Sequence, residues 1–178
     1  MIWLSNSTLV RLRDQLRARG QRPSIVPSGP VTPDMLEMLN ALAEYGPLCE
    51  AMYLMMSADG KITDDEREVL KGALRNLSGD GLRSAHIESM LDSAAKAVGE
   101  KGRDGCMNDV IEHLKEDPAR GEVAFVLAAA IAFADNAVAD EENETLNTLA
   151  EGLGIDEARA NSLLDAVDTD LKGQGGTA

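Results

Sequence analysis

The chain has 178 residues, of which 44% are hydrophobic and 27% are charged, and this composition excludes a disordered segment and a membrane-spanning protein. Only 3% of the residues are aromatic, and because β-strands favour aromatic and β-branched side chains, a core of Ala, Leu, Val, Ile and Met favours packed helices. The 31 acidic and 17 basic residues give a net charge of −14, so the chain repels phosphate backbones and nucleic acid is not expected as a partner.

The N-terminal arm, residues 1–33, differs in charge from the rest of the chain. It carries five arginines and one acidic residue. Leu9, Leu12 and Leu16 fall on one helical face, which predicts a short amphipathic helix from about Ser7 to Gly20. The proline-rich stretch that follows is typical of an extended linker. Two interpretations stay open: the arm contacts an anionic membrane or an acidic partner, or it lies on the acidic surface of its own chain.

The remaining chain has helical patterns throughout and no alternating strand pattern. Capping signals predict helices that begin after Thr32, Thr63 and Asp117. The helix from 118 has no polar face, so it is expected at the centre of a bundle. We therefore expect an all-α bundle of about seven helices over residues 34–171, with a flexible tail at 172–178. The segments expected are 33–57 with an interruption at Gly46-Pro47, 64–77, 84–98, 104–116, 118–133, 140–152 and 157–171.

Cysteine and methionine positions carry no sign of a reactive or metal-binding centre. Two cysteines and two histidines are too few for a disulfide framework or for most zinc sites. Cys49 lies in an apolar run and is expected to be buried, whereas Cys106 follows a glycine-rich stretch and is expected to be exposed. The methionines in apolar helical runs are expected to fill the core; they are Met35, Met38, Met52, Met55 and Met56. The chain has no signal-peptide pattern at its start and no membrane-length apolar run, which favours a cytoplasmic location.

Two acidic segments resemble each other at an offset of 76 residues. Residues 58–74 and 134–150 share six of seventeen positions, which exceeds chance and predicts an internal repeat of helical hairpins related by a pseudo-twofold axis. Each segment has Ala-Asp at the end of a buried helix, a branched apolar residue and then an acidic helix start. The first segment also matches positions five to twelve of a calcium-binding EF-hand loop, but Met55 stands at the first ligand position, and Ile131 stands there for the second segment. Neither side chain offers an oxygen, so an EF-hand is excluded.

The pattern A-D-G-x-[IV]-x-x-x-E-x-x-x-L is followed about 76 residues later by A-D-x-x-[IV]-x-x-x-E-x-x-x-L and then by L-A-E-G-L-G-I. This arrangement resembles the TerB (tellurite-resistance) family, whose domain also occurs in some DnaJ-type co-chaperones. The resemblance covers about residues 35–170. It implies an all-helical bundle, metal binding through acidic residues and a role in a stress-response assembly near the membrane rather than catalysis. The metal-ligand candidates carried over by position are Asp59, Asp64, Glu66, Asp135, Asp140 and Glu142. Asn136 stands where the motif has glycine.

The same carboxylates also have a structural interpretation. Glu66 can close a capping box with Thr63, whereas Ala139 cannot cap with its side chain, which leaves Glu142 without that role. Asp59 and Asp135 can cap the turns that follow their helices. If these residues bind metal, oxygen ligands favour Ca²⁺, Mg²⁺ or Mn²⁺ over zinc.

The leading hypothesis is a non-enzymatic domain that binds a divalent cation or a protein partner through the two acidic segments. The alternative is a pure protein–protein or membrane-tethered scaffold without metal, held at the periphery of a membrane by the basic arm. A carboxylate–metal hydrolase is the third and least favoured hypothesis, because two histidines leave few ligands for a catalytic metal. A small-molecule substrate is not expected, and a second copy of the chain stays open as a partner.

Overall fold

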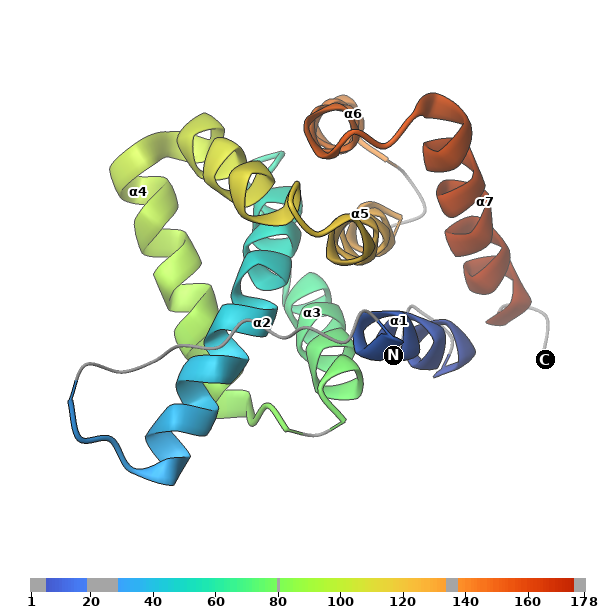
Figure 1. Cartoon of the computed structure of the whole chain (residues 1–178). Coiled ribbons are helices and arrows are strands. Elements are labelled where there is room, and N and C mark those ends of the chain that lie inside the picture. The colour runs from blue at the N-terminus through green and yellow to red at the C-terminus, as the bar shows by residue number, and fades with distance from the viewer. Residues whose placement is uncertain (1–5, 19–28, 80, 134–137, 175–178) are drawn as a thin grey trace.

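The structure, a computed structural model, describes residues 6–18, 29–79, 81–133 and 138–174. These ranges contain seven helices and no strand, so the predicted all-α fold is confirmed (Figure 1). The helices are α1 (Asn6–Ala18), α2 (Pro33–Met56), α3 (Asp64–Leu77), α4 (Ser84–Leu114), α5 (Pro118–Ala132), α6 (Asp140–Leu153) and α7 (Glu157–Gln174).

Helix α5 lies at the centre of the bundle and contacts each of the other six helices. All but one of its residues from Arg120 to Ala132 are buried, including Phe125 and Ile131. A helix without a polar face must bury its whole surface, which explains its central position. The sequence-based prediction for α5 is therefore confirmed.

Helix α2 does not break at Gly46-Pro47, and this part of the prediction is wrong. The helix runs without interruption through Pro47 and lies against α3, α4, α5 and α6. Proline removes one backbone hydrogen bond from a helix interior, but burial of the following apolar run, Leu48 to Met56, outweighs that loss. Local breaking signals are weaker than tertiary packing in this helix.

Helix α4 contains the predicted break as a kink. Gly102 has φ 77° and ψ 166°, which only glycine adopts readily, and it separates an N-terminal half from a C-terminal half. The second half of α4 begins with Arg103 and turns away from the direction of the first half (Figure 1), and α4 contacts α6.

Helix α1 lies on the helical body instead of extending from it. Leu9, Leu12 and Leu16 are at most 5% exposed and belong to the same core as α3 and α5. The predicted amphipathic helix is confirmed, and its apolar face is already covered by the rest of the chain. Within the described ranges, no helix combines the length and hydrophobicity that a bilayer span requires.

Two predictions of side-chain burial are wrong. Cys106 is buried, because the kink at Gly102 directs it into the core. Met35 is 48% exposed, because it lies in the first turn of α2, away from the other helices. Met52, Met55 and Met56 are buried as predicted, and the side chain of Met38 lies outside the part of the chain that the structure describes.

Candidate functional site

The first acidic segment begins with a tight turn after α2. Gly60 has φ 77°, and its N–H donates to the carbonyl of Ser57 at 3.1 Å. Asp59 is exposed and its Oδ1 accepts a hydrogen bond from the backbone N–H of Lys61 at 2.9 Å. Asp59 therefore caps the turn, as its structural interpretation predicts.

Glu66 caps the start of α3. Its Oε2 accepts from the backbone N–H of Thr63 at 2.7 Å and from the Thr63 hydroxyl at 2.8 Å, while Thr63 Oγ1 accepts from the Glu66 N–H at 3.2 Å. Glu66 is only 4% exposed, so its carboxylate is satisfied inside the fold by the helix terminus.

Glu142 has a similar role at the start of α6, which corrects the expectation that it lacked one. Ala139 has no side-chain oxygen, but its backbone N–H donates to Glu142 Oε2 at 2.8 Å. Thr63 and Ala139 have the same extended backbone, with ψ 156° at both. The two segments therefore share a buried glutamate that accepts from the backbone of the capping residue. The internal repeat itself stays a prediction.

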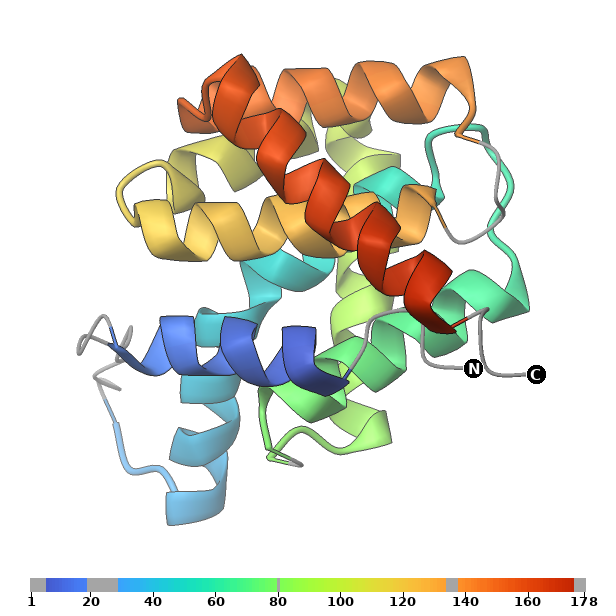
Figure 2. The same ribbon diagram turned by 90° about the vertical axis from the view of Figure 1, so that its right-hand side faces the viewer.

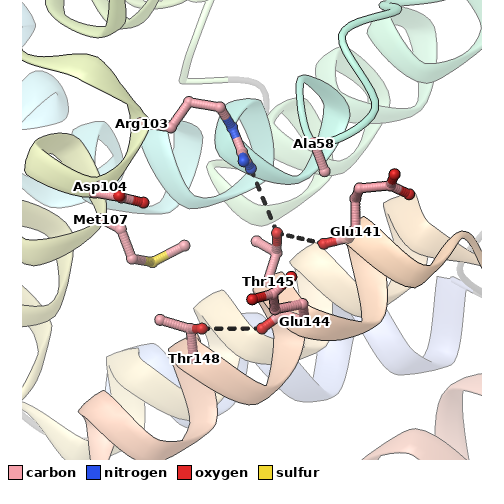
Figure 3. Close-up of a pocket in the computed structure, with 8 residues that line it drawn as sticks. All are labelled: Ala58, Arg103, Asp104, Met107, Glu141, Glu144, Thr145 and Thr148. Carbon is pink, nitrogen blue, oxygen red and sulfur yellow. Dashed lines mark hydrogen bonds between the residues drawn. The ribbon is translucent and has the colours of Figure 1, made fainter.

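The two acidic segments meet at one pocket of about 180 Å³ (Figure 3). Ala58, at the end of the first segment's buried helix, lies on one side, and Glu141, Glu144, Thr145 and Thr148 of α6 lie on the other. The second half of α4 supplies the remaining wall with Arg103, Asp104 and Met107. The loop before α3 and the start of α6 also lie at the same end of the molecule in Figure 2.

None of the five described metal-ligand candidates lines this pocket. Asp59, Asp64 and Asp140 are exposed, whereas Glu66 and Glu142 are buried in their caps. Asp135, the sixth candidate, lies outside the described residues, as does Asn136.

Arg103 joins three helices at the pocket and was missed by sequence reasoning. Its Nη2 donates to the carbonyl of Leu54 in α2 at 2.7 Å and lies 3.4 Å from Thr145 Oγ1 in α6. Thr145 Oγ1 in turn donates to the carbonyl of Glu141 at 2.7 Å. The Arg103 Nε is buried without a hydrogen-bond acceptor among the described residues. Only the fold brings these partners together, since they are more than 40 residues apart in sequence.

Comparison with known proteins agrees with this architecture. The family model described as Tellurite resistance protein TerB matches residues 48–165, which is more than half of the chain. The chain belongs to the TerB family. No curated protein and no solved structure was found to match it. The TerB match begins in the middle of α2 and includes both acidic segments and the pocket between them, but it excludes α1.

A metal site of the kind that TerB membership suggests needs several ligands at one point. Among the described residues, no three carboxylate, imidazole or thiolate groups lie close enough to hold an ion. Glu66 would have to release the Thr63 N–H and hydroxyl to turn its Oε2 toward a cation. The first segment as folded therefore does not fit a three-ligand site, and the turn at 134–137 lies outside the described residues.

The exposed carboxylates of the two acidic segments of this TerB domain make up what we call the acidic face, which consists, among the described residues, of Asp59, Asp64, Asp65, Glu68, Asp140, Glu141 and Glu144. These side chains come from both acidic segments, and two of them, Glu141 and Glu144, line the pocket (Figure 3). Like charges at this density raise the free energy of the free protein and attract cations. The arrangement can bind a positively charged group without any catalytic residue.

The two thiols of the TerB domain are poor nucleophiles. Burial, with a smaller contribution from the neighbouring Glu50 carboxylate, raises the pKa of Cys49 to about 12. Burial also raises the pKa of Cys106, with a smaller contribution from the same carboxylate. Nucleophilic catalysis needs the thiolate, so neither cysteine is suited to it at neutral pH.

Proposed function

We propose that this TerB-family chain is a non-catalytic binding module whose acidic face takes up a positively charged protein surface. The observation that carries the proposal is that three exposed carboxylates, Asp104, Glu141 and Glu144, line the pocket where the second acidic segment meets Ala58 of the first. A partner lysine or arginine placed there gains attraction from several carboxylates at once, and complementary charge mainly sets specificity and the rate of association.

The structure gives the acidic face a firm base. The Arg103 hydrogen bond to Leu54 and the caps of Glu66 and Glu142 hold α2, α4 and the starts of α3 and α6. Preorganised surface charges need less rearrangement on binding, which supports recognition rather than folding upon binding.

The test uses decalysine as the probe and fluorescence anisotropy as the readout. The variant Glu141→Lys/Glu144→Lys reverses two charges at the pocket. The control Glu116→Lys/Glu157→Lys makes the same change in net charge at two exposed positions, one in the turn between α4 and α5 and one at the start of α7. We expect the first variant to bind at least about tenfold more weakly than the control, a difference of about 1.4 kcal/mol. Equal affinities would show that decalysine senses only the net charge and would overturn the proposal.

A divalent cation is the second candidate ligand. Asp59 and Asp64 are both exposed at opposite ends of one short loop, and their oxygens suit Ca²⁺, Mg²⁺ or Mn²⁺. Calorimetric titration with each ion should give a binding heat that disappears in Asp59→Asn/Asp64→Asn. No heat from any of the three ions in the unmodified chain would remove this candidate and leave the protein-binding proposal intact.

A further inference from the structure

We infer that the surface of α3 and α5 beneath α1 is a docking groove for a basic amphipathic helix. Helix α1 occupies the groove within the chain, and a helix of the same pattern from another protein takes it when α1 leaves. This groove is separate from the acidic face, so the inference does not depend on the function proposed above.

The apolar contact defines what the groove accepts. Leu9, Leu12 and Leu16 are 2%, 3% and 5% exposed, and they follow the i, i+3, i+7 spacing by which helices bind in hydrophobic grooves. Val10, on the other side of the same helix, is 42% exposed. The groove therefore recognises one leucine-lined face and leaves the rest of the helix in water.

The hydrogen bond that the described residues of α1 make to α5 is weak. Gln15 Nε2 donates to Glu122 Oε2 at 3.4 Å, but Glu122 already forms a two-bond ion pair with Arg159 of α7, with both distances at 2.8 Å. The Nε of Arg13 is buried without an acceptor among the described residues. A buried donor without a partner disfavours the docked state, so the contact favours reversible docking.

Helix α1 also leaves part of the groove unfilled. A pocket of about 200 Å³ lies between α1, α5 and α7, and Arg11, Leu12 and Gln15 form its α1 wall. Figure 2 shows α1 and the C-terminal part of α7 on the same side of the bundle. A partner helix with a larger apolar side chain at the position of Leu12 would fill this space and gain contacts that α1 does not make.

The groove and helix α1, which occupies it, differ in family coverage and in charge. The TerB match, residues 48–165, includes α3 and α5 and excludes α1. Residues 1–33 hold five arginines and one acidic residue, within a chain of net charge −14. Because the body is acidic, a basic helix is attracted to it, whether it belongs to this chain or to a partner.

The test measures whether the groove opens to a helix added in trans. The probe is a fluorescein-labelled peptide of residues 6–18, and the protein is the full chain, either unmodified or with one substitution. Leu12→Asp places a charge on the buried face of α1. Val10→Asp, the control, places the same charge on its exposed face. Because α1 belongs to the same chain as the groove, its effective concentration there is on the order of millimolar. The peptide can bind only those molecules in which α1 has left the groove, so its apparent affinity is reduced in proportion to the fraction of such molecules.

We expect the peptide to bind Leu12→Asp at least about tenfold more tightly than the unmodified chain or Val10→Asp. Equal affinity for all three forms, or no binding to a folded Leu12→Asp chain, would overturn the inference. A peptide with serine at the three leucine positions should not bind. Binding of the chain to anionic vesicles without any peptide binding would assign α1 to a lipid surface and would also overturn it.

Hydrogen exchange of the unmodified chain keeps the inference testable if Leu12→Asp fails to fold. The backbone amides of α1 should exchange at least about tenfold faster than those of α5, because α1 opens without global unfolding. Equal exchange rates in the two helices would show that α1 leaves only when the whole chain unfolds, and would contradict reversible docking.

Discussion

The acidic residues of this chain separate into two groups that sequence patterns alone do not distinguish. Glu66 and Glu142 are buried and accept hydrogen bonds from backbone N–H groups at helix starts, whereas Asp64 and Asp140, two residues earlier in the same turns, are exposed. A buried carboxylate is tolerated because the helix terminus supplies hydrogen bonds and a favourable dipole. The buried pair stabilises the fold, which leaves the exposed group available for binding.

The capping residues give a direct test at this scale. Thr63 and Ala139 share the same extended backbone, but only Thr63 has a side-chain oxygen for the first turn of its helix. We expect Ala139→Thr to raise the free energy of unfolding by about 1 kcal/mol, because it adds the missing cap at α6. Urea unfolding measures it, and Thr63→Ala should lower the same quantity by a similar amount. If Ala139→Thr lowered the free energy of unfolding, the two helix starts would not be equivalent.

Burial of Cys49 predicts a loss of stability at alkaline pH. Burial raises the pKa of its thiol from 9.0 to about 12 in the folded chain. Between these values the unfolded chain releases the thiol proton and the folded chain keeps it, so the free energy of unfolding falls as the pH rises. We expect this group to lower the free energy of unfolding by about 1 kcal/mol between pH 9 and pH 10.

The measurement is urea unfolding at pH 9 and pH 10 for the unmodified chain and for Cys49→Ala. Cys49→Ala is less stable than the unmodified chain at both pH values because it leaves a small cavity. Its free energy of unfolding should nevertheless fall less between pH 9 and pH 10 than that of the unmodified chain. An equal further loss in both proteins would show that the Cys49 thiol does not titrate in this range.

The helices that the sequence predicts well are those with local signals at their ends. Thr63 and Glu66 mark the start of α3, and Asp156 marks α7 by accepting from the Arg159 N–H at 2.8 Å. The continuity of α2 through Pro47 had no local signal, because it depends on the helices packed around it. Local chemistry fixes where helices begin, and tertiary contacts decide whether a breaking residue ends them.

Two glycines of α4 test this distinction. Both Gly99 and Gly102 have room for a methyl group. They differ in backbone conformation, because Gly99 lies in a regular helix and Gly102 has φ 77° and ψ 166°. We expect Gly99→Ala to raise the free energy of unfolding by about 0.5–1 kcal/mol. Gly102→Ala should lower it by about 1–3 kcal/mol, because alanine is strained in that backbone conformation. Thermal and urea unfolding of both variants measure this, and equal effects would show that the kink can straighten without cost.

At the scale of the whole molecule, the all-helical fold and the buried position of α5 could be predicted, but the pocket could not. The sequence singled out the acidic segments, and the structure brings Ala58 of the first and Glu141 of the second to one pocket. Arg103 follows a glycine and has no distinguishing neighbours in the sequence. Its importance comes from contacts with Leu54 and Thr145. Long-range contacts of this kind arise from the packing of complete helices, so no local pattern marks them.

Replacement of Arg103 should change stability and binding in opposite directions. Arg103→Met keeps much of the apolar stem, but it removes the donor to the Leu54 carbonyl and the contact with Thr145. We expect the free energy of unfolding to fall by about 1–2 kcal/mol, since hydrogen bonds that join α4 to α2 and α6 are lost. The affinity for decalysine should rise, because the pocket loses its positive charge and keeps Asp104, Glu141 and Glu144.

Urea unfolding and anisotropy measure the two effects, with the exposed Arg83→Met as the control for the change in net charge. If Arg83→Met raised the decalysine affinity as much as Arg103→Met, the peptide would be bound by overall charge, and the pocket would have no special part in recognition.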